Sequence, residues 1–146
     1  MFLGQGCNSI IKILVICLIM PFVLSCSSLG KSQKNSDGLF AIVQDLNNAV
    51  RWQDYKTASV MVSPAMQDDF WNLADELYKT VRIMDFETRN CSLDESGASG
   101  VAILRYRIYY TNSPQVFTKT IHQRYCYSPK EEIWQLVQHD MGSLLP

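Results

Sequence analysis

The hydrophobic pattern of this chain changes its period near Val81. Before that residue, apolar side chains recur at intervals of three and four residues, which is typical of amphipathic helices. After it, apolar and polar side chains alternate, most clearly in residues 101–111, which is typical of strands with one buried face. Helices and strands are therefore segregated along the chain. This order predicts an α+β domain rather than a series of alternating strand–helix units.

Three helices are predicted before this change. The first begins at Ser36 or Asp37, either of which can cap it, and carries one apolar stripe formed by Leu39, Ile42, Val43, Leu46, Ala49 and Val50. Asp54 can cap a short second helix. Ser63 as N-cap and Pro64 in the first turn open a third helix, whose buried face consists of Met66, Phe70, Leu73, Ala74 and Leu77.

Four antiparallel strands joined by hairpin loops are predicted after the change, over residues 81–93, 101–111, 116–127 and 133–138. In the second strand, one face carries Ala102, Leu104, Tyr106, Ile108 and Tyr110. Matching this face to the apolar face of the third strand pairs Tyr106 with Ile121 and Ala102 with Tyr125. The predicted fold is three N-terminal helices packed on a curved four-stranded antiparallel meander.

The long first helix of residues 39–50, the entry to the second helix at residues 52–58, and the sheet around Tyr106, Tyr127 and Trp134 together resemble the NTF2-like (cystatin-like cone) superfamily. The resemblance covers nearly all of residues 39–138 and implies an NTF2-like domain over residues 38–146. Members of this superfamily include isomerases, dehydratases, transport factors and many non-catalytic binding or assembly domains. The resemblance therefore implies a fold rather than one activity.

A second pattern lies at the N-terminus, where Lys12 precedes the apolar residues 13–20. The tetrapeptide Val23-Leu24-Ser25-Cys26 then resembles the lipobox of bacterial lipoproteins. This resemblance implies that residues 1–25 are a signal peptide that is removed and that Cys26 carries lipid. Ser27, where lipoproteins retained in the inner membrane tend to carry Asp, implies delivery to the outer membrane. The alternative is a retained membrane anchor, which would need roughly 20 apolar residues.

The lipobox also implies where the domain works, because a lipidated Cys26 would hold it at the outer membrane, facing the periplasm. Residues 26–37 are rich in Ser, Lys and Asn and are interpreted as the lipidated N-terminus and a flexible tether. Buried acyl chains contribute about 0.8 kcal/mol per CH₂ to membrane binding. An anchored domain therefore needs no membrane-binding surface of its own.

The chain has 5 cysteines, of which only Cys91 and Cys126 are neither in the signal peptide nor at the lipidation position. The predicted hairpin places Cys91 opposite Val101 or Ala102, and the predicted register places Cys126 opposite Val101. The two thiols then flank the same middle strand, about 9–10 Å apart. A disulfide needs Cα atoms within about 7 Å, so both thiols are predicted to be free, unless a bulge brings them together.

Tyr55, Asp85, Tyr106 and His122 are the polar residues that could serve catalysis, since NTF2-like enzymes commonly place an Asp, His or Tyr inside the cone. His122 shares a strand face with Thr118, Thr120 and Arg124, which points away from the core. No acid–base pair can therefore be assembled, and no catalytic residue is assigned. His122 and Cys126 lie on one face without a third ligand, so neither a metal site nor a cofactor is predicted.

The 13 basic and 14 acidic side chains nearly balance, which argues against nucleic-acid binding. Tyr109, Tyr127 and Trp71 cannot all point inward, so an aromatic patch on the outer sheet face could serve an envelope-protein partner or a homodimer, unless neighbouring side chains cover these rings. The leading hypothesis is a lipid-anchored, non-enzymatic binding or assembly module. The alternative is an NTF2-like enzyme or small-molecule carrier that uses the cone interior.

Overall fold

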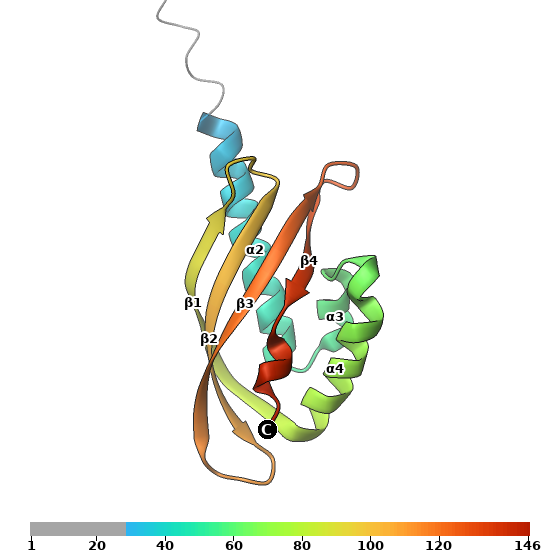
Figure 1. Cartoon of the computed structure of the whole chain (residues 1–146), viewed down its shortest axis with the longest axis vertical. Helices are drawn as coiled ribbons and strands as arrows, with labels where there is room; N and C mark the ends of the chain where they lie inside the picture. Colours follow the sequence, from blue (N-terminus) through green and yellow to red (C-terminus); the bar gives the residue numbers. More distant parts are fainter. Residues whose placement is uncertain (1–28) are drawn as a thin grey trace, which may run out of the picture. The chain divides into compact units, whose positions relative to one another are not determined.

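The chain forms its helices first and its antiparallel sheet afterwards (Figure 1). The computed structural model describes residues 29–146, so the predicted signal peptide, Cys26 and Ser27 lie outside the described residues. The helices are α2 (Leu29–Arg51), α3 (Tyr55–Val60) and α4 (Gln67–Thr80), with short 3₁₀ helices η2 (Pro64–Met66) and η3 (Met141–Leu144). The strands are β1 (Val81–Leu93), β2 (Ser99–Tyr110), β3 (Val116–Ser128) and β4 (Ile133–His139). Residues 34–146 form one compact unit.

Helix α2 begins earlier than the sequence predicts. The predicted start at Ser36 or Asp37 is wrong, because the helix starts at Leu29 and residues 29–37 of the predicted flexible tether are helical. Extending a helix costs far less than starting one, so the Ser, Lys and Gln residues of this segment can continue turns that the core stabilises further along. The side chain of Asn35 donates a hydrogen bond to the carbonyl of Gly97 at 3.2 Å and so links this part of α2 to the β1–β2 loop.

The two predicted capping residues behave differently. Asp54 caps α3 as predicted, because its Oδ1 accepts the backbone N–H of Thr57 at 3.1 Å. Ser63 and Pro64 open the next helical segment as predicted, but that segment is the 3₁₀ helix η2, the Ser63 side chain makes no capping bond, and α4 starts only at Gln67. Ser63 is buried beside β4, where its backbone N–H donates to the carbonyl of Leu136 at 2.9 Å.

The four strands form one antiparallel meander in the order β1-β2-β3-β4. The inner and outer faces of β2 are those predicted, but the pairing of β2 with β3 is shifted by two residues. Ile121 lies opposite Leu104 instead of Tyr106, and Tyr125 lies opposite Gly100 instead of Ala102. A shift of two residues leaves every side chain on the same face, so the apolar pattern alone cannot separate these registers.

Strand β1 carries two bulges. Its register with β2 shifts between Ile83 and Asp85 and again between Thr88 and Asn90, which leaves Met84 and Arg89 without a partner in the ladder. Bulges bend a strand and increase its twist, in agreement with the strong twist of the sheet in Figure 1.

The core lies between the helices and the inner face of the sheet. Its largest fully buried apolar side chains are those of Leu39, Leu46, Phe70, Leu104, Ile108, Ile121, Leu136, Met141 and Leu144. Gly100 allows α2 to approach β2 closely, because a Cβ there would overlap the side chain of Leu39 and lie 3.1 Å from the carbonyl oxygen of Ser92. The edge of β4 is covered by a parallel bridge between Val62 and Leu136. None of the helices within residues 29–146 has the length and apolar character that crossing a membrane requires.

Candidate functional site

A cluster of four polar side chains lies inside the fold, where the sequence predicts a cone interior. Asn47 comes from α2, Tyr106 from β2, and Gln123 and Tyr125 from β3. Each has a relative exposure of 1% or less. Phe86 of β1 stacks on the ring of Tyr106 at a centroid distance of 5.7 Å and supports it from the side. We call Asn47, Tyr106, Gln123 and Tyr125 the interior network.

The polar groups of the interior network are hydrogen-bonded to one another and to neighbouring protein atoms. The two amides bond to each other twice: Asn47 Nδ2 donates to Gln123 Oε1 at 2.9 Å, and Gln123 Nε2 donates to Asn47 Oδ1 at 2.8 Å. The Tyr106 hydroxyl donates to Asn47 Oδ1, and the Tyr125 hydroxyl donates to Gln123 Oε1 at 2.7 Å. The remaining amide protons donate to the carbonyl of Val43 at 2.6 Å and to Met141 Sδ at 3.6 Å. Both amides thereby fill their hydrogen-bonding capacity with protein groups.

Burial keeps the tyrosines of this region protonated. It raises the pKa of Tyr106 well above its usual value, and Tyr125 and Tyr55 add to that rise. Burial likewise raises the pKa of Tyr125, and it raises the pKa of Tyr55 to about 12. Tyr55 is buried against the ring of Phe70, at a centroid distance of 6.4 Å. These phenols can donate hydrogen bonds, but burial disfavours the phenolate that a base or a nucleophile would need.

Asp85 and His122, the other two candidates from the sequence, lie on the outer face of the sheet, away from Tyr106. Arg107 Nε donates to Asp85 Oδ1 at 2.8 Å, and this hydrogen bond lowers the pKa of Asp85. His122 lies with its Nδ1 2.9 Å from Asp140 Oδ2, and its backbone N–H donates to Asp140 Oδ1 at 2.6 Å. A pocket of about 170 Å³ is lined in part by this pair. The structure therefore separates the four candidates into two inner and two outer residues.

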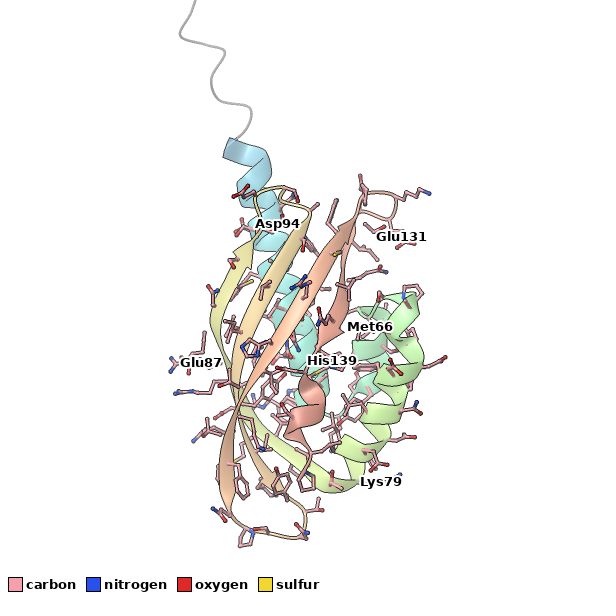
Figure 2. The ribbon with its side chains drawn as sticks, viewed as in Figure 1. Met66, Lys79, Glu87, Asp94, Glu131 and His139 are labelled. Carbon is pink, nitrogen blue, oxygen red and sulfur yellow. The ribbon has the colours of Figure 1, made fainter. Side chains whose placement is uncertain are left out.

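The outer sheet face is mainly charged. Besides the Asp85–Arg107 pair, the Glu87 carboxylate lies 2.8 Å from Nη1 of Arg89 and 2.8 Å from Nη2 of Arg105. Figure 2 shows Glu87 pointing away from α3 and α4. Such exposed ion pairs stabilise a fold little, but they make the face hydrophilic.

Of the three aromatic residues considered for the outer sheet face, Tyr127 is part-buried, with its ring 5.4 Å from that of the buried Trp134. Tyr109 and Trp71 are exposed, but they belong to β2 and α4, respectively. The three rings therefore form no common aromatic patch on the sheet.

The two cysteines of the domain are free thiols and lie on opposite sides of β2. Cys91 lies opposite Ala102, one of its two predicted partners. Cys126 lies opposite Ser99 and not opposite Val101 as predicted, because the register of β2 and β3 is shifted by two residues. Burial raises the pKa of the Cys91 thiol. Among residues 29–146, no group of three or more His, Cys, Asp or Glu side chains could hold a metal ion.

A groove of about 550 Å³ lies between the C-terminal half of α2 and α3, and we call it the α2–α3 groove. It is lined by Asp45, Asn48, Ala49, Trp52, Asp54, Thr57, Val60 and Met61. Trp52 and Val60 expose 72% and 74% of their surface. The guanidinium of Arg51 lies 5.0 Å from the centre of the Trp52 ring.

The interior network and the α2–α3 groove were both missed by sequence reasoning, although the chain carries a signal for the first. Asn47 follows Val43 by one helical turn, and Gln123 occupies the inward position between Ile121 and Tyr125. A polar residue at a position where the period demands an apolar one indicates a buried hydrogen-bonding partner.

No protein-family model matches this sequence, and no curated protein matches it. Solved structures do. A SEC-C motif-containing protein from Rhodopseudomonas palustris aligns with a TM-score of 0.58 and 10% identity over 68% of this chain and 75% of its own. A ketosteroid isomerase-like protein from Erwinia carotovora atroseptica aligns with a TM-score of 0.57 and 11% identity over 71% and 92%.

A putative dehydratase of the NTF2-like family from Streptomyces avermitilis aligns with a TM-score of 0.57 and 13% identity, over 73% of this chain and 94% of its own. Identities this low establish a shared fold and not a shared activity. The domain therefore has an α+β, NTF2-like fold.

Proposed function

We propose that this chain is a lipid-anchored protein of the bacterial cell envelope whose NTF2-like domain is a non-enzymatic binding or assembly module. In this proposal, residues 1–25 are a signal peptide, residues 26–37 are the lipidated N-terminus and the link to the domain, and residues 38–146 are the domain. Cys26 carries the lipid, and the domain faces the periplasm from the outer membrane. No cofactor is required.

The observation that carries the non-enzymatic part of the proposal is the interior network. A catalytic site needs polar groups that are free to bond the reacting atoms of a substrate. Here Tyr106 and Tyr125 donate their protons to amide oxygens, and the two amides bond to each other. A substrate that entered this interior would first have to break these buried bonds, each of which is costly to leave unmade.

The anchor part of the proposal is supported by the sequence alone. The apolar residues 13–20 and the Val23–Ser25 tripeptide before Cys26 are what the lipoprotein resemblance rests on. A domain held by acyl chains can present its whole surface to partners, because the lipid alone supplies the membrane affinity.

Membrane fractionation tests the anchor. We expect wild-type protein to be found in the membrane fraction and to incorporate an alkyne-labelled palmitate. The Cys26→Ala variant is expected to lose both the label and the membrane association. Cys91→Ala is the matched control and is expected to keep both. A Cys26→Ala variant that still fractionates with membranes contradicts lipidation.

Affinity capture tests the binding role. The lipoprotein is solubilised in detergent and captured, and native mass spectrometry then reads both its bound proteins and its bound small molecules. A reproducible envelope-protein partner, or a homodimer, supports the proposal. Recovery of a stoichiometric small molecule without any protein partner contradicts it.

A second candidate is an enzyme or small-molecule carrier that uses the interior. It is favoured by the names of two similar solved structures, one ketosteroid isomerase-like and one a putative dehydratase. In that case the Asn47–Gln123 pair would open to admit a ligand beside Tyr106. The same mass spectrometry distinguishes the two candidates, since only the second predicts a bound small molecule that Tyr106→Phe weakens.

A further inference from the structure

The α2–α3 groove combines exposed apolar surface with negative charge. Trp52 and Val60 lie at its rim with about three quarters of their surface exposed, and the buried Ala49 and the part-buried Met61 form its apolar floor. Large apolar side chains that gather at a concave surface mark binding sites more often than singly scattered ones do. The groove volume of about 550 Å³ lies in the range of pockets that hold a ligand or a few side chains of a partner.

The charged side chains that line the groove are both acidic, although Lys56 acts on Asp54 from nearby and Arg51 lies over the Trp52 ring. The groove lining includes the carboxylates of Asp45 and Asp54 and no basic side chain. Within residues 29–146, neither carboxylate takes part in an ion pair. Asp54 is held in its ionised form, because the hydrogen bonds from Thr57 lower its pKa. An occupant that complements this lining carries a positive charge beside apolar groups.

The ring of Trp52 already contacts one cationic group. The guanidinium of Arg51 lies 5.0 Å from the centre of the indole ring, within the range of cation–π attraction. An indole has two faces, and at 72% exposure this ring still has surface open to a second cation.

The groove is also preformed by the backbone. Helix α2 ends at Arg51, and Gln53, two residues later, lies in the left-handed region at φ 60°, where its N–H donates to the carbonyl of Val50 at 3.0 Å. The next N–H, of Asp54, donates to the carbonyl of Ala49 at 2.9 Å, and the Asp54 side chain then caps α3. This pair of bonds is a Schellman motif, which fixes the angle between α2 and α3. A non-glycine residue held in this conformation costs about 1 kcal/mol.

From these observations we infer that the α2–α3 groove docks a basic segment of a partner protein, in which an Arg or Lys lies beside an aliphatic residue. The cationic group stacks on Trp52 between Asp45 and Asp54, and the aliphatic side chain packs against Val60 and Met61. This inference rests on the proposed binding function and names the surface and the chemistry of the partner.

A random-peptide library displayed on phage tests the inference on the full chain, purified in detergent with its N-terminus intact. Peptides are selected on wild-type protein and counter-selected on Trp52→Ala, and the enriched peptides are synthesised for titration. We expect them to carry Arg or Lys next to an aliphatic residue. We expect Trp52→Ala and Asp45→Asn each to weaken binding by about tenfold or more.

Two matched variants control for general effects of the substitutions. Trp71→Ala removes another exposed tryptophan, and Asp75→Asn neutralises another exposed carboxylate, both on α4 and outside the groove. Both are expected to bind the peptides like wild type. Binding is also expected to weaken as salt is raised from about 50 to about 300 mM, because the attraction is partly electrostatic.

Enriched peptides without a basic residue, no enrichment at all, or equal losses in Trp52→Ala and Trp71→Ala would overturn the inference. So would a homodimer in sedimentation that Trp52→Ala dissociates, since the occupant would then be a second copy. Native mass spectrometry of the same preparation separates this failure from failure of the proposed function. A bound small molecule without any protein partner contradicts the function, whereas a protein partner retained by Trp52→Ala contradicts only the groove.

Discussion

At the scale of single residues, Tyr106 and Asn47 make different contributions to the interior network. In Tyr106→Phe, Asn47 Oδ1 keeps its bond from Gln123 Nε2, so the variant loses one hydrogen bond and about 1 kcal/mol of unfolding free energy. Asn47→Ala leaves the Tyr106 hydroxyl and both ends of the Gln123 amide short of partners, and it is expected to cost about 3 kcal/mol or more. Urea unfolding followed by circular dichroism measures both losses.

Tyr109→Phe is the matched control for this pair. Its ring is exposed on the outer sheet face, so removing the hydroxyl should change the unfolding free energy by less than about 0.5 kcal/mol. If Tyr106→Phe and Asn47→Ala cost the same, the bonds of the network would not be coupled as the geometry requires.

Gln53 supports a second residue-scale prediction. Its φ of 60° places a Cβ in the left-handed region, which glycine occupies without penalty. Gln53→Gly is therefore expected to stabilise the domain by about 0.5–1 kcal/mol, although it removes the weak 3.4 Å hydrogen bond from Gln53 Nε2 to the Val81 carbonyl. Gln53→Ala keeps a Cβ at the same φ and should not stabilise. Equal midpoints of thermal unfolding for the two variants would contradict this explanation.

Sequence patterns predict the position of single residues, but not their partners. The alternation in β2 predicts the inward position of Tyr106, and that of β3 predicts the outward position of His122. It does not predict the network, because Asn47 and Gln123 are 76 residues apart and only the docking of α2 on β3 joins them. A periodic pattern assigns a side chain to a face, but it carries no information about which buried polar groups on two different elements meet.

At the scale of elements, the antiparallel sheet keeps the two thiols too far apart to form a disulfide. Cys91 lies in β1 opposite Ala102, and Cys126 lies in β3 opposite Ser99, so β2 runs between them. Two strand spacings are about 9–10 Å, which is longer than a disulfide can bridge. We expect residues 29–146 of protein from an oxidising compartment to take up two alkylating groups, and Cys91 to react more slowly than an exposed thiol because burial raises its pKa. Mass spectrometry under non-reducing conditions checks this, and a Cys91–Cys126 peptide would contradict the register.

The same elements explain which boundaries the sequence could predict. The start of β1 follows directly from the change of period at Val81. The start of α2 does not, because the residues before Ser36 carry no apolar stripe. Their helical form depends on continuing a helix that the core stabilises elsewhere. The β2–β3 register fails for a related reason: a slip of two residues preserves the inner face, and the five-residue loop 111–115 leaves both registers within reach.

At the scale of the whole molecule, we expect the acid sensitivity of folding to depend on His139, at the end of β4 and labelled in Figure 2. Burial lowers the pKa of His139 below its usual 6.5, although Asp140 and Asp69 partly oppose this. Its Nδ1 accepts the N–H of Met141 at 3.3 Å, and its Nε2 is buried without a partner among the described residues. The folded state therefore favours the neutral imidazole more than the unfolded chain does, where the group binds a proton near pH 6.5.

The difference between the two pKa values of His139 sets the sign of the pH dependence. Below pH 6.5 the unfolded state binds more protons than the native state. The unfolding free energy is therefore unaffected by His139 above that pH and decreases as the pH falls below it. The carboxylates with lowered pKa values, Asp54, Asp85 and Asp94, lose their contributions only near and below their usual 3.8. Urea midpoints measured between about pH 7.5 and about pH 5 should therefore decrease in wild type and stay nearly flat in His139→Gln, whose amide can still accept from Met141. An equal slope in both proteins would place the acid sensitivity on other groups and contradict the lowered pKa of the part-buried His139.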